Sequence, residues 1–465
     1  MIQLPSAVCF EKSSRSEQSY PPGPKGISAL AQCLSRQQDP LLSLQKIAVK
    51  HGDIVHMQLG GRHEYLINHP DHIKAILCAP QSEMARSTPP ALKRLLGRGL
   101  LTSQGDYHRQ HKRMLAPAFH REIVRQWNGT ITAKCAQLRD RWSEGDQLNV
   151  ETEMLRLTLA IVLKALLSAE PEGDTDGITT AANTLIKMIH CRTLPVIDDL
   201  LDKVAIGRIR RFKEASAHFD AIVYRMMRER RAENAPCNDL LFALLRVCDE
   251  ETGNTALTDE EVRDETLTML MAGHETTAHA LTWTWYLLSQ HPETEQRLHA
   301  ELRTVLQGRT PDITDLEALP YNRMIFSEAM RLYPPVWIVA RRNPEAWSLA
   351  GYTLPPGSFI FMSQYLVHRD ARYFPDPEHF KPERWTAEAT AKRPRYSYFP
   401  FGGGPRLCIG EGFAWAIGLL VLATVAQRWR LRLAPAQRVA LEPLITLRPK
   451  YGMRMIVEPH FKQTV

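Results

Sequence analysis

The segment that most constrains the fold of this chain is Phe-Gly-Gly-Gly-Pro-Arg-Leu-Cys-Ile-Gly at residues 401–410. It sets a single cysteine, Cys408, after three consecutive glycines and two residues before Gly410. Glycines let backbone amides turn toward the sulfur, so a lone thiolate in this frame suits axial ligation of a haem iron. Arg406 can meet a carboxylate, and haem carries two propionates. Taken alone, Cys408 could be a buried free cysteine, but the frame favours a ligand, and the rest of the fold must then accommodate a haem.

The composition is that of a globular protein with one large core. The chain has 465 residues, of which 44% are hydrophobic and 23% charged, and a core built around a cofactor can absorb that length. The net charge of +7 is mild and spread along the chain, which argues against nucleic-acid binding and fits docking of a small acidic electron-transfer protein. The eight cysteines are dispersed without a Cys-x-x-Cys pair, so neither a zinc site nor a disulfide framework is expected.

The order of sequence patterns predicts a mainly α fold with a smaller β-rich region. Apolar and polar residues alternate over 52–67 around two glycines, which indicates a hairpin. From about 107 to 306 the periodicity is helical, with interruptions near 170–178 and 234–239. We expect residues 1–20 to form a flexible N-terminal segment and residues 21–465 to form a single domain. The sequence holds no run of ~20 apolar residues, so no membrane anchor is expected.

A second motif lies within a helix predicted over Asp259–Gln290, where residues 272–277 read Ala-Gly-His-Glu-Thr-Thr. Gly273 weakens a helix interior by roughly 1 kcal/mol relative to alanine, and the motif can open the backbone ladder and leave room for a small ligand. Glu275 and Thr276 form an acid–alcohol pair suited to relaying protons. The alternative is a solvated carboxylate beside a threonine that only packs. His274 is expected to be a core or surface residue rather than a metal ligand.

Charged residues form two further patterns. Glu328 and Arg331 lie three apart on one helical face, and the apolar run that follows them predicts that the pair faces inward; Arg384 follows in Pro-Glu-Arg-Trp at 382–385. His108 and Lys112 are four residues apart and share a helical face. Arg341 follows the apolar segment 336–340.

These motifs, in this order, resemble the cytochrome P450 family over about residue 20 to the end of the chain. The resemblance implies a fold that holds haem between a long oxygen-activating helix and the cysteine-ligand loop. Cys408 would be the axial iron ligand, Thr276 would hydrogen-bond the bound dioxygen, Glu275 would help deliver protons and Ala272 would pack against the haem face. The cofactor-binding residues would also include Phe401, Gly402, Arg406 and Gly410.

The same resemblance assigns the remaining charges. Glu328, Arg331 and Arg384 would form a buried network that braces the cysteine loop; the residue after Arg384 is often phenylalanine in the family and is Trp385 here. The propionate contacts would be His108, Lys112 and Arg341. If the helix register is shifted by one residue, His111 or Arg113 would make these contacts instead. Arg342 is the alternative to Arg341.

The implied function is a soluble, cytoplasmic, bacterial-type haem-thiolate monooxygenase, acting as a monomer. It would contain haem b, use dioxygen, and take electrons from NAD(P)H through a ferredoxin or flavodoxin and its reductase. The substrate would be an apolar fatty acid, terpenoid or polyketide-like molecule, bound by the segments 84–101, 184–204 and 336–339. The alternatives are a peroxide-using peroxygenase, an oxygen-independent isomerase or dehydratase, and a haem sensor.

Overall fold

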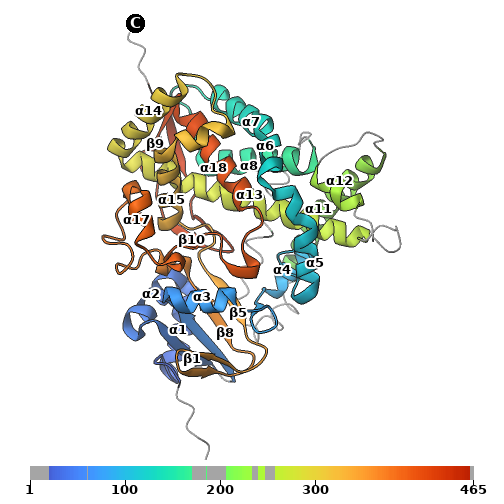
Figure 1. Ribbon diagram of the computed structural model, residues 1–465, viewed down its shortest axis with the longest axis vertical. Coiled ribbons are helices and arrows are strands. Elements are labelled where there is room, and N and C mark those ends of the chain that lie inside the picture. The colour runs from blue at the N-terminus through green and yellow to red at the C-terminus, as the bar shows by residue number, and fades with distance from the viewer. Residues whose placement is uncertain are drawn as a thin grey trace, which may run out of the picture.

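The computed structural model describes residues 20–59, 61–169, 185, 206–232, 239–246 and 257–460. Helices make up most of this part and lie above a smaller sheet region (Figure 1), so the predicted mainly α class is confirmed. The segment before Tyr20, the interruptions expected from residues 170 and 234 onward, and all of 184–204 except Leu185 lie outside the described residues.

A five-stranded sheet forms the lower part of the molecule in Figure 1, beside helices α1 (Ile27–Gln38), α2 (Pro40–His51) and α3 (Pro70–Cys78). The predicted hairpin is present as two antiparallel strands. β8 adds to it in parallel, and β5 and β3 follow antiparallel. The strand order is β1-β2-β8-β5-β3, with bounds Ile54–Leu59, Arg62–Ile67, Phe359–Met362, Val339–Arg342 and Ala85–Arg86.

The long helix predicted over Asp259–Gln290 is α13, which has the same bounds. It begins with a capping box between Thr258 and Glu261, and its acidic first turn complements the helix dipole. At 1.5 Å per residue it is about 48 Å long, and buried residues occur on all of its faces, as expected of a helix inside the core. It packs against α8 (Val150–Leu167), α15 (Pro320–Leu332) and α18 (Glu411–Ala426).

The remaining elements surround this core. The other helices are α4 (Pro90–Leu96), α5 (Gly105–Leu115), α6 (Arg121–Gln126), α7 (Asn128–Arg141), α11 (Ile206–Ala232), α12 (Leu240–Arg246), α14 (Pro292–Leu306), α16 (Gln364–Val367) and α17 (Ala387–Ala391). Short 3-10 turns lie at Ala116–Phe119, Ile313–Ala318, Pro382–Trp385, Arg395–Ser397 and Gly404–Arg406. Small antiparallel sheets join β4 (Gln147–Asn149), β12 (Arg454–Pro459) and β9 (Trp429–Leu433), then β10 (Leu441–Pro443) and β11 (Leu447–Pro449), and β6 (Trp347–Leu349) and β7 (Tyr352–Leu354). Within the described ranges, no helix has the length and apolar character that crossing a bilayer requires.

Candidate active site

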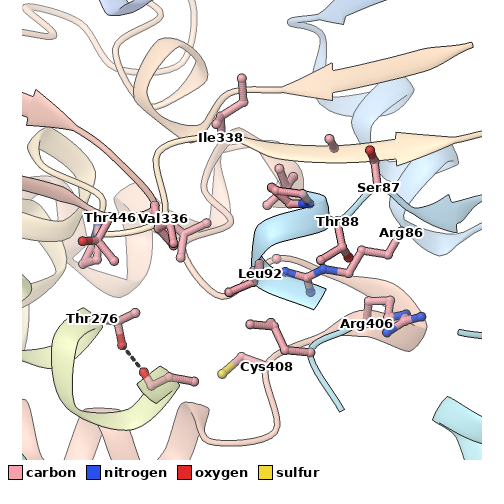
Figure 2. A pocket seen from close by; sticks show the side chains of 18 of the residues that line it. Arg86, Ser87, Thr88, Leu92, Thr276, Val336, Ile338, Arg406, Cys408 and Thr446 are labelled. Atoms are coloured by element: carbon pink, nitrogen blue, oxygen red, sulfur yellow. Dashed lines mark hydrogen bonds between the residues drawn. The ribbon is translucent and has the colours of Figure 1, made fainter. Parts of the chain in front are cut away.

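A cavity of about 1720 Å³ separates α13 from the cysteine loop, the segment 399–410, and reaches β5 and β3 of the five-stranded sheet. The residues predicted from separate motifs for catalysis and cofactor binding come together on its wall. They are His108, Lys112, Ala272, Glu275, Thr276, Arg341, Phe401, Gly402, Arg406, Cys408 and Gly410. Figure 2 shows Cys408 and Thr276 facing the same space from different elements, with apolar residues such as Val336, Ile338 and Leu92 around it.

The cysteine loop takes its shape from positions that only glycine tolerates. Gly402 and Gly404 have φ angles of +77° and +62°, in the left-handed region that disfavours side chains. A Cβ on Gly404 would lie 2.0 Å from the carbonyl oxygen of Leu77 in α3. The Cys408 N–H donates to the Phe401 carbonyl over 3.1 Å and closes the loop. The thiol is thereby presented to the cavity (Figure 2).

Positive charge and a backbone amide surround the Cys408 sulfur. Burial and the nearby Glu411 charge raise the pKa of this thiol, whereas a hydrogen bond from the Gly410 N–H and the charges of Lys112 and Arg86 oppose the rise. The Lys112 ammonium donates to the Pro405 and Leu407 carbonyls over 2.8 and 3.1 Å. Lys112 therefore supports the cysteine loop directly, a contact that its sequence spacing did not indicate.

On the opposite wall, α13 remains an unbroken α-helix through residues 272–277. The motif can open the backbone ladder at Gly273, but in this structure the ladder is continuous there. Gly273 instead permits close packing against α8, because a Cβ there would lie 3.2 Å from Cγ2 of Val162. The Thr276 hydroxyl donates to the Ala272 carbonyl over 2.8 Å, so its oxygen is left to accept from a ligand in the cavity.

Glu275 is buried and accepts a hydrogen bond from the Thr446 hydroxyl over 2.8 Å. This contact contradicts the alternative of a solvated carboxylate. Thr446 lies between β10 and β11, 171 residues from Glu275, so no local sequence pattern could predict this contact. His274 is also buried, with Nδ1 3.1 Å from the Leu270 carbonyl, so it is a core residue, and burial lowers its pKa.

Three arginines converge on the end of the cavity beside the cysteine loop. Arg86 and Arg341 are register partners on β3 and β5, and Arg406 lies near Arg86 in Figure 2. Burial lowers the pKa of Arg341 to about 9 and that of Arg86 to about 10. Burial and the charge of Arg86 lower the pKa of Arg406 to about 10.

These cations have no carboxylate counterion within the described residues. Arg406 donates to the Ser103 and Leu100 carbonyls, but its buried Nε has no partner. Among the residues that the structure describes, no carboxylate forms an ion pair with any of the three arginines. A ligand with two carboxylates would relieve this repulsion and fill the open donors. The donor set therefore fits the propionates of haem, and Cys408 lies on the same loop as Arg406.

The structure separates the alternatives that the sequence left open. His108 lines the cavity with Nδ1 3.0 Å from Gln81 Nε2, and burial together with the Arg406 and Lys112 charges lowers its pKa to about 3. His111 instead pairs with Glu265 of α13 over 2.7 Å. Arg342 also lines the cavity, but it is exposed and donates to the Gly357 carbonyl; Arg113 is exposed as well.

The predicted brace residues meet in a buried network around one carboxylate. Arg331 donates to Glu328 through Nε and Nη2, each over 2.8 Å. Arg384 Nε donates over 3.2 Å and the Lys381 N–H over 3.0 Å. The Trp385 indole N–H adds a bond of 2.9 Å. Arg331 also donates to the His368, Pro377 and His379 carbonyls, which ties α15 to the segment before the cysteine loop.

Comparison with known proteins agrees with this geometry. The cytochrome P450 family model matches residues 21–454. Cyclooctatin synthase of Streptomyces melanosporofaciens is 36% identical over 94% of this chain and 95% of the relative. Cyclooctat-9-en-7-ol 5-monooxygenase of the same organism is 35% identical over 89% of both chains. Pentalenene oxygenase of Streptomyces avermitilis is 30% identical over 91% of this chain and 94% of the relative. The chain thus belongs to the cytochrome P450 family of haem-thiolate monooxygenases.

Proposed function

We propose that this enzyme hydroxylates an apolar, terpenoid-like hydrocarbon with dioxygen, and that Cys408 is the axial ligand of a haem b. The observation that carries the proposal is an arrangement around one largely apolar cavity. It comprises one thiol, a pair of proton-handling side chains and a set of arginines that have no carboxylate partner among the described residues. When bound, the haem iron would supply the reductive activation of dioxygen. The chain's own residues would orient the substrate, exclude water and control protons.

Two groups of residues would hold the cofactor, one at the iron and one at the propionates. Gly410 and the charges of Lys112 and Arg86 favour the thiolate form of Cys408. Arg86, Arg341 and Arg406 would bind the propionates, and neutral His108 would add a hydrogen bond. Phe401, Gly402 and Ala272 would form walls against the flat faces of the macrocycle.

The substrate class is supported by the walls and by the relatives. Two of these are named for oxidation of cyclooctat-9-en-7-ol and of pentalenene. The predicted pocket segments 84–101 and 336–339 contribute Leu92, Leu96, Val336 and Ile338 to the cavity. Such walls would position a rigid hydrocarbon by shape and would leave regiochemistry to packing.

Electrons would come from NAD(P)H through a separate ferredoxin or flavodoxin and its reductase. A monomeric state and a cytoplasmic location also stay predictions. The test is product formation from a panel of cyclic terpenes with NADPH, a ferredoxin and its reductase. We expect a hydroxylated product that requires dioxygen. Product under anaerobic conditions would favour an isomerase or dehydratase. Product with hydrogen peroxide but none with dioxygen and the reduced ferredoxin would favour a peroxygenase.

A further inference from the structure

A chain of hydrogen bonds runs from Glu275 through the cavity wall at Thr446 to Glu151. Thr446 Oγ1 donates to Glu275 Oε1 over 2.8 Å, and His279 Nδ1 lies 3.1 Å from the same hydroxyl oxygen. The other ring nitrogen, Nε2, lies 3.2 Å from Glu151 Oε1 in the first turn of α8. Every step is within hydrogen-bond distance, so the chain is continuous from Glu151 to the cavity wall.

The exposed fractions of these side chains show which end of the hydrogen-bond chain can reach solvent. His279 and Glu275 are 1% and 5% exposed, whereas Glu151 is 14% exposed. Glu275 and Thr446 belong to the cavity lining described above, but His279 and Glu151 do not. Figure 2 places Thr446 and Thr276 on the same side of the pocket, across from Cys408. One end of the chain is therefore accessible from outside the cavity, and the other reaches the reacting space.

We propose that Glu151, His279 and Thr446 form a proton-entry chain that reprotonates Glu275 between turnovers. The inference rests on the proposed monooxygenase function, which consumes protons at the cavity. None of these residues needs to touch the substrate, because each acts through Glu275.

Counting the protons shows that the contacts can carry one. The Thr446 hydroxyl has a single proton, so if it donates to ionised Glu275 it must accept from His279 Nδ1–H. One further proton is carried by the Glu151 carboxyl, which donates it to His279 Nε2. If each proton moves by one hydrogen bond toward Glu275, Glu275 becomes the acid, Thr446 donates to Nδ1, and Nε2–H donates to ionised Glu151. Three protons are present before and after, and Glu151 regains its proton from water.

A purely structural role explains the cluster less well. Two buried or half-buried carboxylates and a fully buried histidine are costly to desolvate, and apolar side chains of similar volume are often at least as stabilising. Glu275 already has one satisfying donor in Thr446. His279 and Glu151 are not needed to hold Glu275 in place, but they supply a source of protons.

The first test measures coupling in variants at Thr446. Inserting one oxygen atom from dioxygen consumes two electrons and two protons, whereas hydrogen peroxide already carries both. Thr446→Val breaks the chain at nearly constant volume, and Thr446→Ser keeps the hydroxyl. Thr282→Val is the matched control, because the Thr282 hydroxyl is buried on α13, the helix of Glu275 and His279, and within the described part of the chain it bonds only to the Ala278 carbonyl. We expect product per NADPH to fall at least about tenfold in Thr446→Val but not in the other two, and peroxide-driven product to be kept in all three. Equal coupling in Thr446→Val and the wild type would overturn the proposal.

The second test does not depend on turnover. In ¹⁵N-histidine-labelled holoprotein in the diamagnetic ferrous–carbon monoxide form, the His279 ring N–H signals are identified by their loss in His279→Gln. A relay predicts that Glu151→Gln slows their exchange with solvent, because the proton source is removed. Mere loss of packing predicts faster exchange through a loosened core, and faster or unchanged exchange would reject the relay. If exchange slows but the wild type forms no product, the proton chain stands and the proposed function fails.

Discussion

The Trp385 indole N–H donates to Glu328 Oε2 over 2.9 Å, within a carboxylate site that also receives Arg331, Arg384 and the Lys381 backbone. The sequence marked Trp385 only as a departure from a common phenylalanine. In the structure the larger ring supplies a donor that phenylalanine does not have. Glu328 is fully buried, so each donor offsets part of the cost of keeping its charge out of water.

Trp385→Phe should lower the free energy of unfolding by about 1.5 kcal/mol, because one hydrogen bond to a charged group is lost while the ring remains. Haem content should stay at the wild-type level, since both arginines still hold Glu328. Urea unfolding of the holoprotein measures the change. Unaltered stability would mean that the indole contributes only by packing.

Arg331→Ala should have a much larger effect and leave the protein largely without haem. It strands Glu328 as a buried charge, which costs about 3–5 kcal/mol, and it frees the His368, Pro377 and His379 carbonyls. Glu328→Ala should behave similarly. The measurement is haem absorbance per protein after identical expression, with Trp385→Phe as the mild control. Wild-type haem content and melting temperature in Arg331→Ala would disprove the bracing role.

Cys408→Ser should yield a folded protein without the thiolate signature. The side chain is nearly isosteric, and the loop geometry depends on glycines and on the Cys408 N–H bond to Phe401, which serine keeps. The ferrous–carbon monoxide spectrum reports the ligand. An unchanged, red-shifted Soret band in the variant would contradict the assignment of Cys408 to the iron.

Arg341→Gln should speed haem loss, whereas Arg342→Gln should not. The two residues are neighbours on one strand and both line the cavity, but Arg341 is buried, whereas Arg342 is exposed and donates to the Gly357 carbonyl. Loss of a charge-assisted bond worth about 1.5–3 kcal/mol corresponds to roughly a tenfold to hundredfold faster dissociation. Transfer of haem to an excess of a haem-scavenging globin gives the rate. Equal rates in both variants would show that Arg341 does not hold a propionate.

The sequence predicted what is encoded locally. The hairpin follows from alternating apolar and polar residues, and the approximate bounds of α13 follow from its long apolar helical pattern. The inward-facing Glu328–Arg331 pair follows from one helical turn beside an apolar run. It did not predict Arg86 beside Arg341, because these residues become neighbours only through the pairing of β3 with β5. The contact between Thr446 and Glu275 likewise depends on how the β10–β11 hairpin packs on α13, which no local pattern encodes. Gly273 could locally have opened the helix, but α13 is continuous there, and the absent side chain lets it pack closely against Val162 of α8.

Thr276→Ala separates the oxygen-dependent function from its rivals. Among the residues that the structure describes, the hydroxyl bonds only to the Ala272 carbonyl of its own helix, so its removal should leave the fold, haem binding and substrate binding intact. Electron consumption should continue, but more of it should end as hydrogen peroxide. If proton transfer limits the productive step, the loss of product should be about 10²- to 10⁴-fold, as for other lost acid–base groups. Thr276→Ser keeps the hydroxyl and should recover most of the coupling. Product per NADPH under dioxygen is the measurement. If Thr276→Ala couples as well as the wild type, the acid–alcohol pair does not manage protons, and peroxide-driven or oxygen-independent chemistry becomes the better account of this cavity.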